Sequence, residues 1–266
     1  MMFRNFIKKI IKDKRMYLPV LEMHIVDHCN LKCKGCSHFS NIADEYYVSV
    51  EDFRNSLLLA SKHFRIHSFA LMGGEPFLHP EIKQLIGEAR KILPSARIVI
   101  SSNGMLVDKL GDDVWGELIK NEVFINVSKY PVNSPYFSDI LDKIAYSNVL
   151  GQVVVKNYFR KYINIKGDSI RYMTYDQCYM KHCVTIKGNN IYKCPFSLYV
   201  KYFNKKFNTQ IPVSSGLDLT KTNQKEIKKF LTSPVETCQF CTFEEDKLSL
   251  YKWGVEEAKK EDWIVY

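Results

Sequence analysis

The 266-residue chain lacks any apolar run long enough to span a bilayer, which takes about 20 consecutive residues. Residues 1–18 also lack the continuous apolar stretch and the small-residue cleavage site of a secretory signal peptide. Internal repeats and low-complexity tracts are absent, and aromatics at 13% argue against disorder. We therefore expect a globular, cytoplasmic protein with no membrane span.

Without a signal peptide, the eight cysteines are not expected to form a disulfide framework. Metal binding or redox chemistry is then the default explanation for them. Acidic charge is also scarce, since 29 Asp and Glu stand against 38 Lys and Arg, and the formal net charge is +9. A basic surface attracts phosphorylated substrates or acidic redox partners. Because no zinc-finger or RNA-binding signature is present, we expect no nucleic acid partner.

Short apolar runs alternate with helical patterns through most of the chain. Strands are predicted at residues 21–29, 67–74, 96–104, 123–131 and 148–157, and helices at 49–64, 79–93, 112–122 and 134–147. This alternation indicates βαβ units around a parallel sheet, so the fold class is α/β. Beyond residue 167 the pattern changes: residues 185–194 predict a hairpin, and residues 222–231 and 244–260 predict helices. We divide the chain at residues 1–19, 20–167 and 168–266.

Residues 1–19 form a basic, amphipathic segment. The apolar residues that recur in it at helical spacing are Phe3, Phe6, Ile7, Ile10 and Ile11. The segment is predicted to be a short helix that docks on the body of the protein. A helix that binds a membrane surface or a partner is the alternative.

Cys29, Cys33 and Cys36 form a C-x3-C-x2-C pattern directly after the first predicted strand. A cuboidal 4Fe–4S cluster normally takes one cysteine on each of its four irons, so three thiolates leave one iron open for another ligand. A tetrahedral zinc ion would need a fourth protein ligand, which His24, His28 or His38 could supply. The spacing leaves both metals open.

Two polar motifs end the next two predicted strands, at residues 73–76 (GGEP) and 101–104 (SSNG). The carboxyl ends of parallel strands are where α/β proteins place their active sites. Glycine allows the backbone to approach a ligand closely, and a carboxylate can bind an ammonium group by a charge-assisted hydrogen bond. Each motif taken alone is equally consistent with a tight turn or a strand-end cap.

Together, the three cysteines, the GGEP motif and the strand order resemble the radical S-adenosylmethionine (SAM) superfamily over residues 20–165. The resemblance implies a partial (β/α)6 barrel whose 4Fe–4S cluster is held by Cys29, Cys33 and Cys36, with the open iron bound to the amino and carboxyl groups of SAM. It implies that SAM is contacted by Gly73, Gly74, Glu75, Ser102, Asn103 and Ser128. Many members carry an aromatic residue before the third cysteine, and Gly35 at that position removes a possible adenine contact.

The other five cysteines are Cys178, Cys183, Cys194, Cys238 and Cys241. Their order resembles the twitch domain, a shortened SPASM extension of α+β structure that holds one auxiliary 4Fe–4S cluster. Four ligands complete such a cluster, so Cys178 or Cys183 is in excess. The spare thiol is either a small buried hydrophobe or a hydrogen-atom donor to the substrate radical. A zinc site in this region is the other alternative.

The resemblance implies that SAM is cleaved to a 5′-deoxyadenosyl radical, with an electron from a flavodoxin- or ferredoxin-type donor. We expect dehydrogenation, or else epimerisation, of a carbohydrate, aminocyclitol or nucleotide-sugar, as in sugar-modifying members of the superfamily. Candidates for the pocket lining are His38, Tyr46, Tyr47, Lys129 and Tyr130. Modification of a ribosomal peptide is the first alternative, and a non-catalytic zinc or nucleic-acid-binding protein is a distant one. Trp115, Trp253 and Trp263 are expected to be core or surface anchors.

Overall fold

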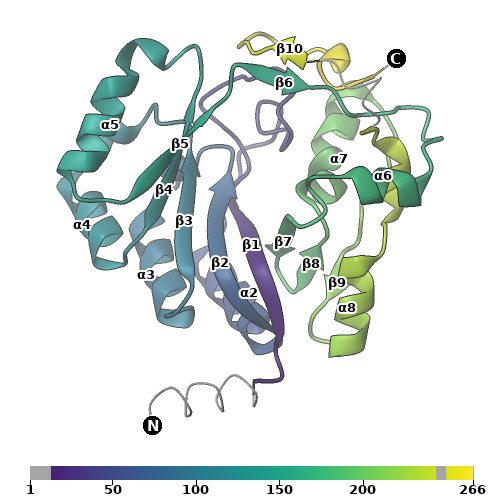
Figure 1. Ribbon diagram of the computed structural model, residues 1–266, viewed down its shortest axis with the longest axis horizontal. Coiled ribbons are helices and arrows are strands. Elements are labelled where there is room, and N and C mark those ends of the chain that lie inside the picture. The colour runs from purple at the N-terminus through teal and green to yellow at the C-terminus, as the bar shows by residue number, and fades with distance from the viewer. Residues whose placement is uncertain (1–12, 244–249, 266) are drawn as a thin grey trace.

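The computed structural model describes residues 13–243 and 250–265. Its first half alternates strands and helices, and each of the strands and α-helices given next overlaps a predicted range. The strands are β1 (Met16–Val26), β2 (Phe64–Gly73), β3 (Arg97–Ser102), β4 (Phe124–Lys129) and β5 (Gly151–Val155), and the helices are α2 (Val50–His63), α3 (Ile82–Ile92), α4 (Asp112–Lys120) and α5 (Phe137–Tyr146). Figure 1 shows these four helices on one face of the sheet that the five strands form.

The second half has shorter elements. They are β6 (Tyr158–Arg160), α6 (Arg171–Gln177), β7 (Val184–Lys187), β8 (Asn190–Tyr192), α7 (Pro195–Phe207), β9 (Leu217–Asp218), α8 (Gln224–Thr232) and β10 (Leu250–Lys252), with the 3-10 turns η4 (Glu236–Phe240) and η6 (Lys260–Asp262). The predicted hairpin is β7 and β8, which pair antiparallel, and the helix predicted at residues 222–231 is α8.

Eight strands form one sheet in the order β5-β4-β3-β2-β1-β7-β8-β9. Strands β1 to β5 run parallel, which confirms the α/β class. The sixth parallel strand is β7, and it pairs with β1 rather than with β5. Strands from both sides of residue 167 thus share one sheet, and the proposed division into domains stays a prediction.

Two expectations about the ends of the chain are corrected. Strand β1 begins at Met16, so residues 16–19, which we assigned to the N-terminal helical segment, are extended. Residues 250–259, which fall in the predicted helix, are not helical, and residues 250–252 form β10 and pair with β6. A backbone partner from a distant segment outweighs local helix propensity there. Residues 1–12 and 244–249 lie outside the described residues.

Helix α7 is an element that the sequence pattern did not predict. Eight of its thirteen residues are buried, including the continuous run from Pro195 to Val200. A helix that is buried on most sides lacks the alternation of apolar and polar faces by which amphipathic helices are found in a sequence.

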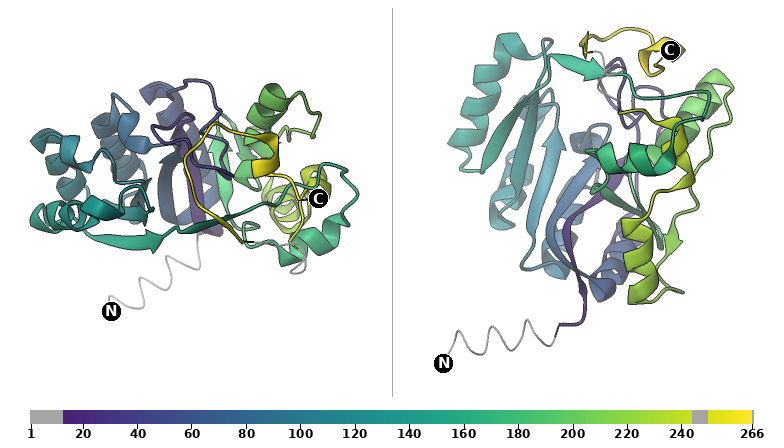
Figure 2. Two further views of the ribbon diagram at one scale, coloured as in Figure 1. Left: turned by 90° about the horizontal axis from the view of Figure 1, so that it is seen from above. Right: turned by 45° about the vertical axis from the view of Figure 1, so that its right-hand side comes forward.

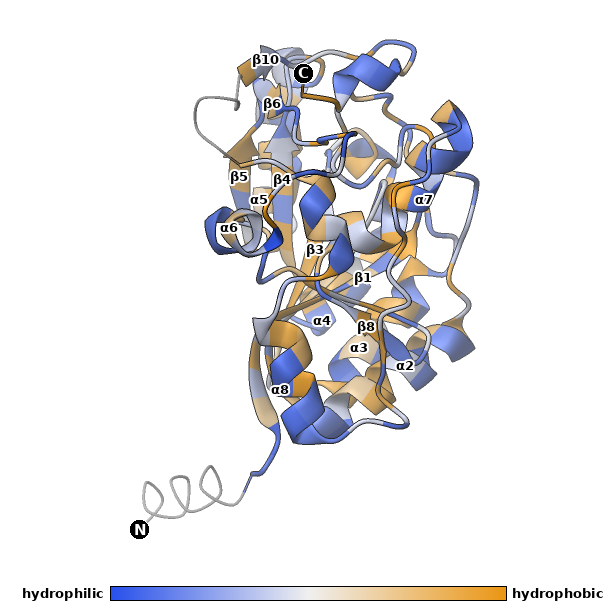
Figure 3. Ribbon diagram, turned by 90° about the vertical axis from the view of Figure 1, so that its right-hand side faces the viewer, coloured by the Kyte–Doolittle hydropathy of each residue, from blue (hydrophilic) through white to orange (hydrophobic). Residues whose placement is uncertain are grey.

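The larger of two hydrophobic cores lies between the sheet and helices α2 to α5. Its fully buried side chains include Leu21, Phe53, Leu85, Ile100 and Leu118. Burying each such side chain contributes about 2 kcal/mol. In Figure 3 the strands are largely orange while the helices are banded orange and blue, as expected for elements that cover one side of a sheet. Within the described residues, no helix combines the length and apolar character that crossing a membrane requires.

A second core joins segments from the two ends of the chain. Phe39, which follows the first cysteine group, packs against Phe196 and Phe203 of α7 and against Trp263 near the C-terminus. Figure 2 shows the yellow C-terminal segment crossing back over the carboxyl ends of the strands. This core therefore holds the first cysteine loop against α7, which begins directly after Cys194.

A buried carboxylate links β1, β7 and α7. Asp27 accepts hydrogen bonds from Lys187 Nζ at 3.0 Å and from the Tyr202 hydroxyl at 2.6 Å. Burial alone would raise the pKa of Asp27, but the His24 ring, the Lys187 charge and the Tyr202 hydroxyl hold it below its ordinary value. A carboxyl group whose pKa is depressed by folding stabilises the protein above its unfolded pKa and loses that contribution as the pH falls.

Replacing Lys187 with Met is expected to lower the free energy of unfolding at pH 7 by about 2 kcal/mol, because Asp27 keeps its buried charge and loses its cation. The deficit relative to the wild type should shrink as the pH falls below about 4, where the carboxyl group begins to protonate. Urea unfolding followed by circular dichroism measures both effects. Lys221→Met is the control, since the Lys221 side chain is 83% exposed and its pair with Asp218 is a surface pair. Equal losses in the two variants would contradict the prediction.

Candidate active site

The two glycines of the GGEP motif are required by packing between β1 and β2. A Cβ atom on Gly73 would lie 2.0 Å from the carbonyl oxygen of Val26, and one on Gly74 would lie 1.8 Å from that of His28. The Gly74 N–H donates to the Val26 carbonyl at 2.9 Å. The glycines therefore let the end of β2 lie directly against the segment that leads into the first cysteine loop.

Glu75 organises the same edge of the sheet. One of its carboxylate oxygens accepts from the Ser102 hydroxyl at 2.9 Å and from the Phe77 N–H at 3.2 Å, and the other accepts from the Asn103 N–H at 2.8 Å. Burial raises the pKa of Glu75 to about 7, and these three hydrogen bonds oppose burial by favouring the carboxylate. Its side chain is fully buried, so it ties the ends of β2 and β3 together and offers no exposed oxygen.

The hydrogen bonds of Glu75 continue through Asn103 to the first cysteine loop. Its Nδ2 donates to Asn30 Oδ1 at 2.7 Å and lies 3.7 Å from Cys29 Sγ. Asn133, which sequence reasoning missed, is fully buried and donates to the carbonyls of Asn103 and Ser128, so it joins the ends of β3 and β4. No motif in the sequence marks Asn133, because its role depends on strands that meet only in the fold.

The three thiols of the first group share one loop. Burial raises the pKa of Cys29, and it raises that of Cys33 to about 12, with the other thiols of the loop adding to both shifts. Metal binding must therefore displace protons from these two thiols. Within the described ranges, no three His, Cys, Asp or Glu side chains are arranged to hold one metal ion. A 4Fe–4S cluster takes each thiolate on a different iron, so its ligands need not converge on a point.

The structure explains why position 35 is a glycine and not an aromatic residue. Its φ is +58°, and a Cβ atom would lie 2.2 Å from the ring of Phe159 and 2.9 Å from the carbonyl oxygen of Asp262. The left-handed conformation and the close approach both require glycine. Phe159 of β6 thus packs where a side chain at position 35 would begin.

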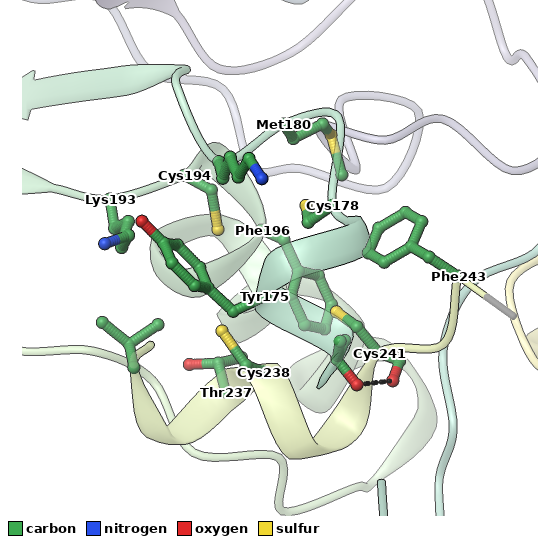
Figure 4. Close-up of a pocket in the computed structure, with 13 residues that line it drawn as sticks. Tyr175, Cys178, Met180, Lys193, Cys194, Phe196, Thr237, Cys238, Cys241 and Phe243 are labelled. Carbon is green, nitrogen blue, oxygen red and sulfur yellow. Dashed lines mark hydrogen bonds between the residues drawn. The ribbon is translucent and has the colours of Figure 1, made fainter. Parts of the chain in front are cut away.

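The second cysteine group lines one pocket. Cys178 follows α6, Cys194 precedes α7, and Cys238 and Cys241 lie in and after η4. Figure 4 shows the four cysteines spaced around this pocket, with Tyr175 and Phe196 between them. The donor set, four thiols from three segments in an enclosed space, fits one 4Fe–4S cluster.

Cys183 does not line that pocket. It lies instead against Glu22 of β1. Burial raises the pKa of Glu22 to about 7, partly offset by a hydrogen bond from the Cys183 thiol. Burial and the neighbouring Glu22 likewise raise the pKa of Cys183 to about 12. Of the two cysteines that the sequence left as the spare, the geometry therefore favours Cys183.

The candidate pocket residues do not gather in one place. His38 is buried edge-on to His24, and Tyr46 lies under the ammonium group of Lys187. The Tyr47 hydroxyl is 3.2 Å from His28 Nε2. Lys129 lies over the ring of Phe137, on the helix side of the sheet, whereas Tyr130 stacks on Trp253 beside the first cysteine loop. Ser128, a candidate SAM contact, hydrogen-bonds through its side chain to Tyr130.

Sequence reasoning missed a polar row on the face of the sheet away from α2 to α5. Glu22 is in register with Thr185 of β7, and Asn126 of β4 is in register with Ser101 of β3. Within the part of the chain that is described, one oxygen of Glu22, the Asn126 amide oxygen and the Thr185 hydroxyl are buried without a hydrogen-bond partner. The same is true of His24 Nε2, whereas His24 Nδ1 lies 3.6 Å from Asp27 Oδ1. Such atoms normally find partners, so on this face they need water or a polar ligand.

The sequence model of the Radical SAM superfamily matches residues 23–145. These residues include the first cysteine group and both strand-end motifs. A GTP 3',8-cyclase of Microcystis aeruginosa (strain NIES-843 / IAM M-2473) is 27% identical over 130 residues, or 47% of this chain and 38% of that protein. A GTP 3',8-cyclase of Staphylococcus haemolyticus (strain JCSC1435) is 28% identical over 173 residues, or 58% of this chain and 50% of that protein. The chain spans half or less of the length of these two relatives.

Among solved structures, the fold is similar to that of BtrN in complex with AdoMet and 2-DOIA. The TM-score is 0.54 at 14% identity, and the match covers 86% of this chain and 94% of that one. At this identity the likeness concerns the fold alone. The superfamily match, the three cysteines at the carboxyl end of β1 and the shared fold agree, and residues 23–145 of this chain are a radical SAM domain.

Proposed function

We propose that this radical SAM enzyme dehydrogenates a carbohydrate, an aminocyclitol or a nucleotide-sugar, and that its two cysteine groups hold two 4Fe–4S clusters. The observation that carries the proposal is the pocket in which Cys178, Cys194, Cys238 and Cys241 meet. Oxidation of an alcohol to a ketone removes two electrons, and abstraction of one hydrogen atom accounts for one of them. The other needs a nearby acceptor, and four thiols in one pocket suit such a centre.

The first group, Cys29, Cys33 and Cys36, would hold the cluster that binds SAM. When bound, that cluster and SAM supply a 5′-deoxyadenosyl radical, which takes a hydrogen atom from the substrate. The chain's own part is to orient the reactants and to exclude water. An external flavodoxin- or ferredoxin-type protein would deliver the electron, and the net charge of +9 favours an acidic partner of that kind.

The backbone of Gly73 and Gly74, together with Ser102, Asn103 and Ser128, is our candidate surface for SAM. Both oxygens of Glu75 already accept hydrogen bonds from the chain, so we assign Glu75 the role of holding this surface in place. That role explains a buried carboxylate at the strand ends without a direct contact to the cofactor.

Changing Glu75 to Gln is expected to lower the free energy of unfolding by about 2 kcal/mol, because the new amide N–H2 faces N–H groups that can only donate. SAM cleavage should fall at least tenfold as the Ser102 and Asn103 positions loosen. Urea unfolding and chromatographic assay of 5′-deoxyadenosine measure the two effects. The control is Glu81→Gln, at an exposed side chain that makes no capping hydrogen bond to its helix. A Glu75→Gln protein as stable and active as this control would contradict the assigned role.

Lys193 adds a positive charge beside the second group. Its ammonium group donates to the carbonyls of Phe230, Leu231 and Ser233. Burial lowers the pKa of Lys193 to about 8, and the neighbouring Cys238, Cys194 and Cys178 oppose that shift when they are thiolates. Thiolate ligands would therefore keep this lysine charged, and its charge would offset part of theirs.

Replacing Cys178, Cys194, Cys238 or Cys241 singly with Ala is expected to reduce iron from about eight to about four atoms per chain, because each removes a ligand of one of two 4Fe–4S clusters. Cys183→Ala should keep about eight. Iron analysis after anaerobic reconstitution makes the measurement. The same Cys183→Ala protein should also still dehydrogenate substrate, whereas an epimerase that uses this thiol as hydrogen donor would lose turnover. Loss of half the iron in Cys183→Ala would overturn the ligand assignment.

The polar row on the inner face supports a substrate rich in hydroxyl groups. Glu22, His24, Asn126 and Thr185 leave donors and acceptors buried without partners, and leaving such groups unpaired costs stability. A polyol or an amino-polyol could pair with several of them at once. Glu22 could also accept a proton from an alcohol or bind an amino group.

Similarity to two GTP 3',8-cyclases makes a purine nucleotide the second candidate substrate. The two candidates differ in what the inner face must bind. A triphosphate needs cations, whereas the row described above contains Glu22 and neutral groups. We therefore rank the carbohydrate class first.

Incubating the reduced, reconstituted enzyme with SAM and deuterated aminocyclitols or nucleotide-sugars tests the ranking. Mass spectrometry should find deuterium in 5′-deoxyadenosine for one of these compounds. It should also find a product two mass units lighter than the same compound without deuterium. Formation of 5′-deoxyadenosine that requires GTP, with no label transferred from any sugar, would replace the carbohydrate proposal with a nucleotide one.

A further inference from the structure

The C-terminal strap, residues 250–265, is attached to both sides of the first cysteine loop. Cys33 pairs antiparallel with Val255, and the adjacent Lys34 N–H donates to the carbonyl of Gly254 at 2.9 Å. Farther along the strap, Trp263 Nε1 donates to the carbonyl of Cys36 at 2.9 Å. The loop that carries the first cysteine group is therefore completed by residues from the opposite end of the sequence.

This pairing places Trp253 diagonally across from Cys33. Side chains two residues apart on extended backbone point to the same face, so Trp253 is the diagonal neighbour of Cys33 across the pair. Two contacts hold Trp253 in place. Its ring stacks on Tyr130 at a centroid distance of 4.9 Å, and its backbone N–H donates to the Asn157 carbonyl at 2.9 Å. Trp253 is 8% exposed, so the ring has little freedom to turn away.

The indole nitrogen of Trp253 has no ordinary acceptor. Within residues 13–243 and 250–265, its N–H is buried and makes no hydrogen bond to any atom of the protein, sulfur included. An indole N–H can only donate, and leaving it unpaired costs free energy.

We propose that Trp253 donates its indole N–H to the sulfur of Cys33 when that sulfur binds the cluster, and that this bond raises the reduction potential of the cluster. The inference rests on the cluster proposed at Cys29, Cys33 and Cys36. Reduction adds negative charge that the sulfur ligands share, and a donor to sulfur favours the more negative state. Hydrogen bonds to the sulfurs are among the factors that set the potential of iron–sulfur clusters. Trp253 thus acts as a positioning residue that eases delivery of the first electron.

Of the other two tryptophans, one supplies a control variant for Trp253. Trp263 already donates to a carbonyl oxygen, so its N–H is committed elsewhere. Trp115 of α4 is also buried, and its N–H also lacks a partner among the described residues, but it lies in the core between the sheet and the helices. Trp115→Phe therefore removes the same chemical group at a site away from both cysteine groups.

The test is a potentiometric titration of the reconstituted full-length enzyme followed by electron paramagnetic resonance. The signal of the first cluster is identified by its loss in Cys33→Ala. In Trp253→Phe, which keeps an aromatic ring in place, the midpoint potential of this signal should be lower than in the wild type. The potential of the second cluster should stay unchanged in the same sample, as should both potentials in Trp115→Phe.

Tyr130→Ala serves as a second variant, because it removes the ring on which Trp253 stacks and should lower the same potential by a smaller amount. It gives the answer if Trp253→Phe fails to take up iron. If the first cluster assembles in these variants with the potential of the wild type, the inference is wrong while the proposed function stands. If the wild type assembles no reducible cluster at Cys33, both fall.

Discussion

Packing of the Trp263 ring against Phe39 is the contact on which both cysteine groups depend. The ring is fully buried, lies 5.8 Å from Phe39 and from Phe203, and donates its N–H to the Cys36 carbonyl. Truncating a buried tryptophan to alanine typically costs about 3–5 kcal/mol. Its absence would leave the first cysteine loop without support on one side and α7 without its partner on the other. Because α7 begins directly after Cys194, a single cluster of aromatic side chains fixes where both groups of thiols lie.

The interior around these groups is built largely without charge. Burial raises the pKa of Cys29 and Cys33 above the range of a free thiol, and it lowers the pKa of His24 and, to about 3, that of His38. Near neutral pH these groups are therefore uncharged until a metal binds. Charge then arrives together with iron, and nearby donors such as the Asn103 amide are already in place to receive it. Preorganised donors avoid the cost of rearrangement when charge appears.

Local sequence patterns were sufficient for β1 to β5 and α2 to α5, because each carries its own periodicity, and α2 also begins at a capping residue, Ser49. They were insufficient where long-range contacts decide the structure. Helix α7 is too buried to show an amphipathic pattern, and β10 is extended because it pairs with β6. At the site, spacing identified the two groups of cysteines but could not separate Cys183 from Cys178, since that distinction depends on which thiol faces Glu22. Asn133 and Trp253 lie outside any motif and reach the site through tertiary contacts alone.

The attachment of the strap to the first cysteine loop has a consequence for how the protein is made. Cys36 and Trp263, which share a hydrogen bond, are 227 positions apart in the sequence, so the ribosome releases the first cysteines long before the residues that cover them. Iron that reached the loop during translation would meet an open, solvent-filled site. A premature stop codon shortly before Trp253 would leave all eight cysteines in the truncated product and still remove the cover of the first group. Counting cysteines in a shortened variant of this chain is therefore a poor guide to whether its catalytic site can form.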